Sequence, residues 1–304
     1  MRRQIFRSAS VAVAVAMAAP AAFAAPAALG APAAPLPDFS GIWWHPSLPG
    51  PEPLASGPTG LKNLTRRRED GASNYNELVG DYTNPILQPW AAEVVKKHGE
   101  LSKSGIVYPN PASQCWPEPL PFIYKNFAVQ LFQQPDKNQI TMLYDQDHEV
   151  RHVRRNQAHP ANVTPSWYGD SVGHYEGDTL VIDTVGQKSG PFAMLDLYGT
   201  PYTKALHVVE RYRLIDYDEA KEGLDRDAKE NFRAGAGTID RAYRGKHLQV
   251  RYTVEDQGVF TTPWSATVTY GRGSEEWPET VCAENVHVYY STDTKVPTAD
   301  KPDF

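Results

Sequence analysis

Hydrophobic and polar residues alternate along much of the chain after residue 126. A period of two predicts strands, because successive side chains of a strand point to opposite faces of a sheet. The predicted strands cover residues 127–133, 139–144, 149–155, 178–187, 205–217, 238–243, 247–256, 264–270 and 286–290. No helices alternate with these strands, so we predict an all-β, mostly antiparallel fold, built as a single barrel or sandwich.

Two segments depart from this pattern and predict peripheral helices. Residues 89–104 begin with a proline, and residues 218–232 are highly charged, as expected for a surface helix. The face of the first helix is expected to carry Trp90, Val94, His98 and Leu101. A further strand is expected at residues 38–44, and residues 38–304 are predicted to form a single β-rich domain.

The first 24 residues have the pattern of a signal peptide. An arginine-rich head is followed by an apolar run at residues 9–19 and by Ala22-Phe23-Ala24, whose small residues suit cleavage after Ala24. The apolar run is shorter than the ~20 residues that a membrane-spanning helix needs. We therefore predict a periplasmic or secreted protein without a membrane span, exported by the general or the twin-arginine route. Residues 25–37 are an Ala/Pro-rich lead-in.

The charge of the chain excludes one class of partner. The 304 residues carry 36 acidic and 30 basic side chains, a net charge of −6, and loss of the signal peptide takes it to −9. Nucleic-acid binding depends on Lys and Arg side chains that neutralise phosphates, so we do not expect a nucleic-acid partner. The one dense basic run, residues 66–68, is followed by two acids and is expected to be a solvated loop.

The chain has two cysteines, Cys115 and Cys282. In an oxidising compartment they are expected to form a disulfide that ties the early part of the domain to its end. Two buried free thiols are the alternative.

Two acidic residues lie on apolar sides of predicted strands. Glu210 shares a side with Val208 and Tyr212, and Asp183 shares one with Val181 and Val185. An ionised carboxylate on an apolar face is costly unless it is paired, and burial raises its pKa towards the range useful for proton transfer. Both acids are therefore candidate acid/base groups. The alternative is a structural ion pair for each, with Arg151, Arg154, Arg211 or Arg241 as the donor.

A glycine-rich segment before the Asp183 strand adds histidines to this set. His159 and His174 are candidate general bases or substrate ligands. Asp170 and Ser171 suggest a Ser/His/Asp set, but the Gly-Asp-Ser-Val-Gly spacing lies in a strand context and not at a strand-to-helix turn, which disfavours a serine hydrolase. The candidate substrate-binding residues are Arg151, Trp167, Asp196, His207 and Arg211.

Residues 148–152 match the His-Glu-x-x-His pattern of zinc proteases. That mechanism needs the pentapeptide on a helix, so that both imidazoles share a face. Here the surrounding sequence predicts a strand, and we therefore expect no metal site.

The stretches 169–184 and 206–212 resemble a large group of secreted bacterial proteins. Their shared core reads approximately HP…GDSxGxWEGDTLVVDT…HSxxLxVxERY, often with an opening DxSGxW that matches residues 38–43 here. The chain departs from the group at Tyr175, where Trp is usual, and at Tyr202-Thr203, where His-Ser is usual. The resemblance implies a β-rich, lipocalin-like barrel and implies no particular reaction.

These observations lead to an exported enzyme that acts on a small, partly apolar or aromatic molecule by acid/base chemistry, as a lyase, isomerase or hydrolase. Glu210 is the expected proton acceptor, with His159 or His174 as its partner and an arginine stabilising the anion. No phosphate-binding glycine loop or dinucleotide fingerprint is present, so no nucleotide cofactor is expected. The rival hypothesis is a non-catalytic ligand-binding barrel, and a structural envelope protein is a third possibility if the barrel is solidly packed.

Overall fold

The computed structural model describes residues 36–277, apart from residues 47, 107, 126–127, 147–148, 191 and 231–238. Ten strands form one sheet in the order β1-β3-β4-β5-β6-β7-β8-β9-β10-β2. The strands are β1 (Gly41–Trp44), β2 (Glu52–Pro53), β3 (Ala128–Gln134), β4 (Gln139–Tyr144), β5 (Val150–Arg155), β6 (Asp170–Glu176), β7 (Thr179–Val185), β8 (His207–Ile215), β9 (His247–Glu255) and β10 (Trp264–Tyr270). The α-helices are α1 (Pro89–Lys103) and α2 (Tyr217–Glu230), and short 3₁₀ turns cover Ala112–Gln114, Phe122–Lys125 and Pro135–Lys137.

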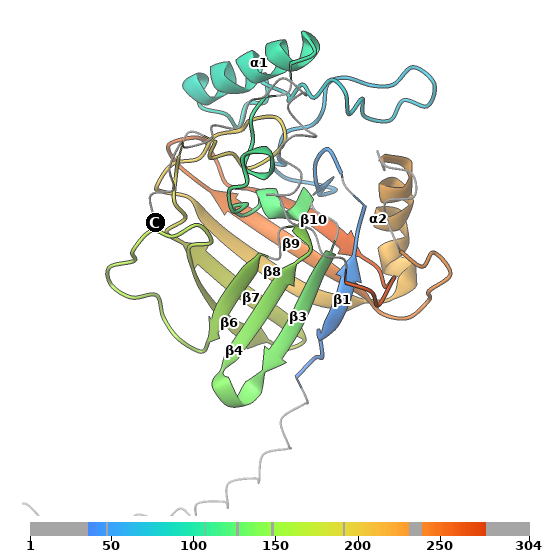
Figure 1. Ribbon diagram of the computed structural model, residues 1–304, viewed down its shortest axis with the longest axis vertical. Helices are drawn as coiled ribbons and strands as arrows, with labels where there is room; N and C mark the ends of the chain where they lie inside the picture. The colour runs from blue at the N-terminus through green and yellow to red at the C-terminus, as the bar shows by residue number, and fades with distance from the viewer. Residues whose placement is uncertain are drawn as a thin grey trace, which may run out of the picture. The chain divides into compact units, whose positions relative to one another are not determined.

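The sheet is strongly curled (Figure 1), and β1 at one end contacts the residue that follows β10 near the other end. Neighbouring strands pair antiparallel except β5 and β6, which pair parallel through Arg154 and Arg155. At the seam, Trp44 of β1 and Gly271, directly after β10, exchange two backbone hydrogen bonds of 2.9 and 2.8 Å. The prediction of an all-β, mostly antiparallel, barrel-like fold with peripheral helices is confirmed.

Arg272 reinforces this seam from the side of β10. Its guanidinium donates to the backbone carbonyls of Ile42 at 2.9 Å and Ser40 at 3.2 Å, and it stacks 3.5 Å from the centre of the Trp43 ring. The free edge of β1 is thus hydrogen-bonded to the Arg272 side chain at positions where no neighbouring strand pairs with it.

The concave face of the sheet is filled by large side chains. Strand alternation turns Leu180 and Ile182 of β7 inward, and the same rule aligns a set of buried tyrosines from other strands. These are Tyr144, Tyr212, Tyr252 and Tyr270. The interior is therefore a packed core in which each tyrosine hydroxyl needs a partner, because an unpaired buried hydroxyl costs free energy.

Helix α1 buries Ala91, Val95, His98 and Gly99. Of the residues that the sequence placed near one face, His98 is buried, whereas Trp90 and Val94 are 47% and 38% exposed. Small residues decide the outcome: a side chain at Gly99 would come within 2.9 Å of the side chain of Val79, so only this face packs closely.

Of the predicted strand 238–243, the structure describes residues 239–243, and these form no strand: Ile239 makes one isolated bridge to Gly273, and a turn follows it. The segment 286–290 lies outside the described residues. By contrast, the strand context of the Gly-Asp-Ser-Val-Gly segment is confirmed by β6, which forms a hairpin with β7.

Helix α2 packs against β9 and β10, and α1 lies across the end of the curled sheet (Figure 1). Among the described residues, neither helix combines the length and the apolar character that crossing a bilayer requires.

Candidate functional site

Glu210 lies inside the curled sheet, fully shielded from solvent. Its carboxylate is held by Arg151, which is itself buried: one guanidinium nitrogen donates at 2.9 Å to Oε1, and the other donates to Oε2. Burial opposes the charge of Arg151, yet the adjacent carboxylate outweighs it and raises the pKa of the guanidinium well above its usual value. The two candidate residues therefore form a buried ion pair.

Hydroxyl groups complete the bonding of this pair. Tyr212 donates to Oε1 of Glu210 at 2.8 Å, and Tyr124 donates to the same oxygen. On the other side of the pair, Arg151 donates to Ser171 at 3.0 Å and to Thr184 at 2.7 Å. A buried polar network in which every member is satisfied fixes the packing around it.

Asp183 lies on the opposite, outer face of the sheet. Its Oδ1 atom is 3.1 Å from Nε2 of His159 and 2.9 Å from Nε2 of His207. Nδ1 of His159 is 2.6 Å from Asp170, whose carboxylate also accepts two hydrogen bonds from Arg154 at 2.7 and 2.8 Å. The structure thus brings two predicted site residues, Asp183 and His159, into contact, and adds the predicted His207 to them.

Asp170, His159, Asp183, His207 and Glu255 form a row of alternating carboxylates and imidazoles, which we call the outer row; it ends at Glu255, whose carboxylate is 3.5 Å from Nδ1 of His207. The hydrogen bond to Asp183 raises the pKa of His207, and partial burial opposes that rise. The hydrogen bond from His207 lowers the pKa of Asp183, against partial burial and with help from His159. Both ring nitrogens of His159 and of His207 thus lie next to carboxylate oxygens.

The remaining predicted histidine and one arginine form a separate pair of contacts. Nε2 of His174 is 3.1 Å from Glu176, and Arg211 donates to the same carboxylate at 2.7 Å. All three side chains lie on the outer face and are well exposed. Strand alternation places Ser171 on the inner face, away from His174, so the structure does not assemble a Ser/His/Asp set from this segment.

Trp167 and Asp196 are positioned by their own loops. Trp167 packs 5.1 Å from the ring of Trp116, and the Lys188 ammonium lies 5.0 Å from its ring centre. Asp196 accepts hydrogen bonds from the backbone of Tyr198 at 2.9 Å and from the hydroxyl of Thr200 at 2.6 Å. Burial raises the pKa of Asp196, and these hydrogen bonds oppose the rise.

The cysteine and metal predictions fall partly on residues that the structure does not describe. Cys115 follows a 3₁₀ turn, whereas Cys282 lies outside the described residues, so the disulfide stays a prediction. His148 also lies outside them, while Arg151 and His152 lie in β5 and not on a helix. Within residues 36–277 where described, no group of three or more His, Cys, Asp or Glu residues is arranged to hold a metal ion.

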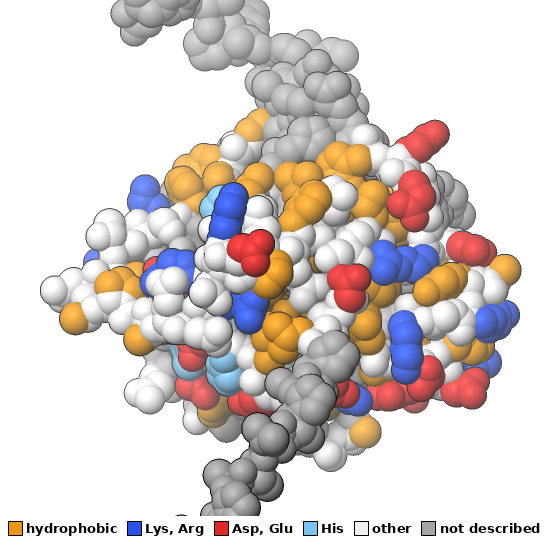
Figure 2. Space-filling view, turned by 90° about the horizontal axis from the view of Figure 1, so that it is seen from below, with side chains coloured by type: hydrophobic (Ala, Val, Ile, Leu, Met, Phe, Trp, Pro, Cys, Tyr) orange, Lys and Arg blue, Asp and Glu red, His pale blue; other side chains and the backbone are white. Residues whose placement is uncertain are grey.

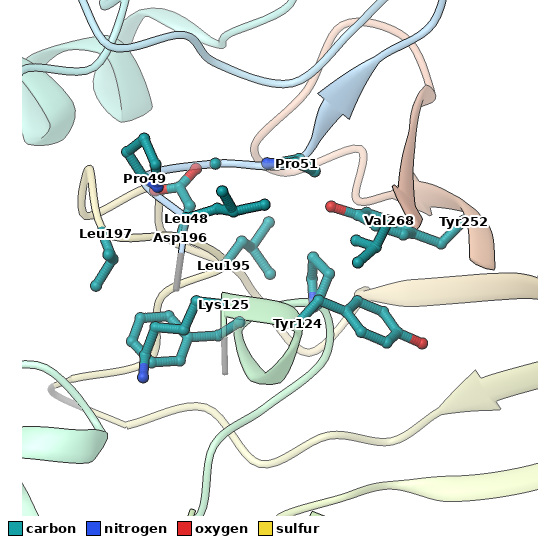
Figure 3. A pocket seen from close by; sticks show the side chains of 13 residues that line it. Leu48, Pro49, Pro51, Tyr124, Lys125, Leu195, Asp196, Leu197, Tyr252 and Val268 are labelled. Atoms are coloured by element: carbon teal, nitrogen blue, oxygen red, sulfur yellow. The ribbon is translucent and has the colours of Figure 1, made fainter. Parts of the chain in front are cut away.

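A small cavity is lined by the predicted loop residue Asp196 and by Tyr124, among others. Leu48, Pro49 and Pro51 lie on one side of it, and Tyr124 and Lys125 lie on the other (Figure 3). Its volume of about 30 Å³ suits one or two water molecules. Since Tyr124 also bonds to Glu210, this tyrosine stands between the cavity and the carboxylate.

A larger cavity, of about 230 Å³, lies on the other side of residues 49–51, which line both. We call it the basic cavity because its lining includes Lys62, Arg66 and Arg226, with Glu230 as the one acid. Arg66 contacts Glu230 at 3.3 Å and donates to Ser73 at 2.8 Å. Arg226 donates through Nη2 to the carbonyl of Pro51 at 2.8 Å. Its Nη1 atom is buried and has no hydrogen-bond partner among the described residues.

Sequence reasoning missed the basic cavity. Arg66 belongs to the run expected to be a solvated loop, and Arg226 belongs to the helix expected to be a charged surface element. The available signal was the dense proline and glycine content of residues 46–60, which is typical of a mostly irregular segment.

Elsewhere the charges are mixed. On the face shown in Figure 2, acidic and basic side chains are interspersed among apolar ones.

Comparisons of the chain with protein-family models, with curated proteins and with solved structures give no match.

Proposed function

We propose that this is an exported protein that binds a small, partly apolar molecule with an anionic group, and that the basic cavity is its binding site. The observation that carries the proposal is a cavity of about 230 Å³ whose lining includes three basic residues, Lys62, Arg66 and Arg226, against one acid. A cavity of about 150 Å³ already accommodates benzene, so there is room for a molecule of that size with a carboxylate.

The chemistry of the lining supports an anion with an apolar body. Three cations and one acid line the cavity, and the acid is already paired with Arg66. Tyr198, Leu61 and neighbouring prolines provide apolar walls. Guanidinium groups bind carboxylates through strong, directional hydrogen bonds. This combination of apolar walls and a few polar anchors is typical of small-molecule sites.

Binding is better supported than acid/base catalysis because the candidate proton-transfer groups are already occupied. Glu210 is neutralised by Arg151 and shielded from solvent. Each imidazole of the outer row contacts carboxylates through both ring nitrogens. A general base must reach the proton that it removes, and none of these groups faces the basic cavity.

The test is titration of the mature protein with benzoate, followed by calorimetry or NMR. We expect saturable binding to the wild type and to Lys229→Gln, which removes an exposed charge from the same helix. We expect Arg226→Gln to weaken binding by about tenfold or more, since one of the three positive charges of the lining is lost. Equal binding by Arg226→Gln, or no saturable binding by the wild type, would refute the proposal.

A second candidate function, acid/base catalysis at the outer row, is favoured by one observation: Asp183 joins two partly exposed imidazoles. Incubation of the protein with a metabolite mixture and mass spectrometry distinguishes the two functions. An enzyme forms product beyond one equivalent, and Asp183→Asn would abolish that product while the exposed Asp178→Asn would not. A binding protein depletes its ligand stoichiometrically and leaves it unchanged.

A further inference from the structure

The carboxylate of Glu230 already occupies one arginine of the basic cavity. Glu230 is the last residue of α2, and its side chain is 12% exposed. One carboxylate oxygen lies 3.3 Å from Nη1 of Arg66, and the other accepts a hydrogen bond of 2.8 Å from the backbone N–H of Ser73. All three residues line the cavity. The cavity thus holds a carboxylate of the protein itself, bound by a guanidinium and a backbone N–H, which are the donors that carboxylate ligands use.

These contacts also join a loop to the helix. Residues 63–80 form a loop whose two ends meet in an isolated antiparallel bridge, and Arg66 and Ser73 form a second bridge inside it. We call residues 63–80 the clasped loop. Arg66 donates to the hydroxyl of Ser73 at 2.8 Å, so the two residues that hold Glu230 also hold each other. Glu230 therefore connects α2 to both sides of the inner bridge.

Arg66 is the more open of the two arginines in the cavity. Its side chain is 44% exposed. Arg226 uses Nη2 for the carbonyl of Pro51, and its Nη1 atom is shielded from solvent. An anion that enters the cavity can therefore form a hydrogen-bonded ion pair with Arg66, and at that position it meets Glu230.

A second carboxylate beside Arg66 is unfavourable while Glu230 stays in place. Like charges a few ångströms apart repel, and one guanidinium compensates one negative charge. The position of Glu230 on its helix makes it easy to displace, because the macrodipole disfavours a negative charge in the last turn. Glu230 is therefore held by its contacts with Arg66 and Ser73 and not by its own helix.

We propose that Glu230 is an internal competitor of the ligand at Arg66. An anion that binds in the basic cavity displaces the Glu230 carboxylate, and the displacement frees the clasped loop from α2. The inference rests on the function proposed above, because it concerns the same cavity. It assigns to Glu230 the control of anion affinity, and it makes ligand binding loosen a contact, whereas binding more often makes a protein more rigid.

Benzoate titration of Glu230→Gln tests the competition. The amide keeps the size of the side chain and removes its charge, so Arg66 becomes free for the ligand. We expect benzoate to bind about twofold to fivefold more tightly than it binds to the wild type, which corresponds to the loss of one partly exposed ion pair. The matched control is Glu222→Gln, which removes an exposed acid of the same helix outside the cavity lining and is expected to bind like the wild type.

Hydrogen exchange at the Ser73 amide tests the displacement in the wild type, without a variant. Ser73 is 8% exposed and its N–H donates to Glu230, so we expect its exchange to become faster when benzoate saturates the protein. Unchanged or slower exchange at Ser73 would overturn the proposal.

The affinities separate this inference from the function on which it rests. Saturable binding of benzoate with equal affinity by the wild type and Glu230→Gln would overturn the competition and leave the proposed function standing. Absence of saturable binding by the wild type would refute the proposed function, and this inference with it.

Discussion

Replacing one partner of the Arg151–Glu210 pair tests whether it stabilises the fold. In Glu210→Leu, the Arg151 guanidinium stays buried with its charge uncompensated, and in Arg151→Met the Glu210 carboxylate does. Breaking a buried ion pair from one side costs about 3–5 kcal/mol in the free energy of unfolding. We expect each single variant to lose stability in this range.

The double variant is expected to recover most of that loss. With both charges gone, the hydroxyls still have partners: Tyr124 and Tyr212 lie 2.9 Å apart, and Ser171 and Thr184 also lie 2.9 Å apart. Replacement of a complete buried pair by apolar side chains is often neutral or stabilising. We therefore expect a total cost below about 2 kcal/mol, and hence a large coupling energy in the double-mutant cycle.

Urea unfolding followed by tryptophan fluorescence and circular dichroism measures all four proteins. With an m-value near 3 kcal/mol/M, a loss of 3–5 kcal/mol lowers the midpoint by about 1–1.7 M. The reasoning would be refuted if the losses in free energy of unfolding of the two single variants simply added in the double variant. Unchanged urea midpoints in the single variants would also refute it. Glu210 would then again be a candidate for acid/base catalysis.

Three further predictions concern the outer row and one close contact. Asp183→Asn removes the hydrogen bond that raises the pKa of His207, so NMR titration should show this pKa falling towards 6.5; an unchanged pKa would contradict the assignment. Because the pKa of His207 is raised by folding, its contribution to stability is complete below pH 6.5 and is lost as pH rises through the folded value. The lowered pKa of Asp183 has the opposite sign: its contribution is present above pH 3.8 and is lost as pH falls through the folded value. The stability difference between wild type and Asp183→Asn should thus be greatest between these limits, which unfolding curves at several pH values would show. Finally, a side chain at Gly60 would lie 2.7 Å from the Trp264 ring, so Gly60→Ala should cost about 1–3 kcal/mol, and a thermal midpoint equal to that of the wild type would contradict this packing.

Strand periodicity predicted the fold well because each strand has one face on a common core. Alternation placed Glu210 on the inner side of β8 correctly, and the alternative of an arginine partner already included Arg151. Alternation could not tell which face of β7 is the inner one, since Val181 and Ile182 are both buried. Asp183 was therefore expected among apolar residues, and it lies on the outer face.

The cavities could not be predicted from local patterns. The basic cavity joins Lys62 and Arg66 to Arg226, which lies more than 150 positions further along the chain. Periodicity describes one segment at a time, whereas a cavity depends on how irregular segments pack. The buried side of α1 also depends on a distant segment, because Gly99 packs closely against Val79.

The seam of the sheet has a consequence for association between molecules. Exposed edge strands with free N–H and C=O groups invite strands of other chains and promote aggregation. Here one edge strand, β2, has only two residues, and one of them is Pro53, which has no N–H to offer. At the other edge, the Arg272 guanidinium occupies the Ile42 and Ser40 carbonyls. An incoming strand would have to displace a charged side chain before forming its first hydrogen bond, so a curled sheet with an incomplete seam is still protected from edge-to-edge polymerisation.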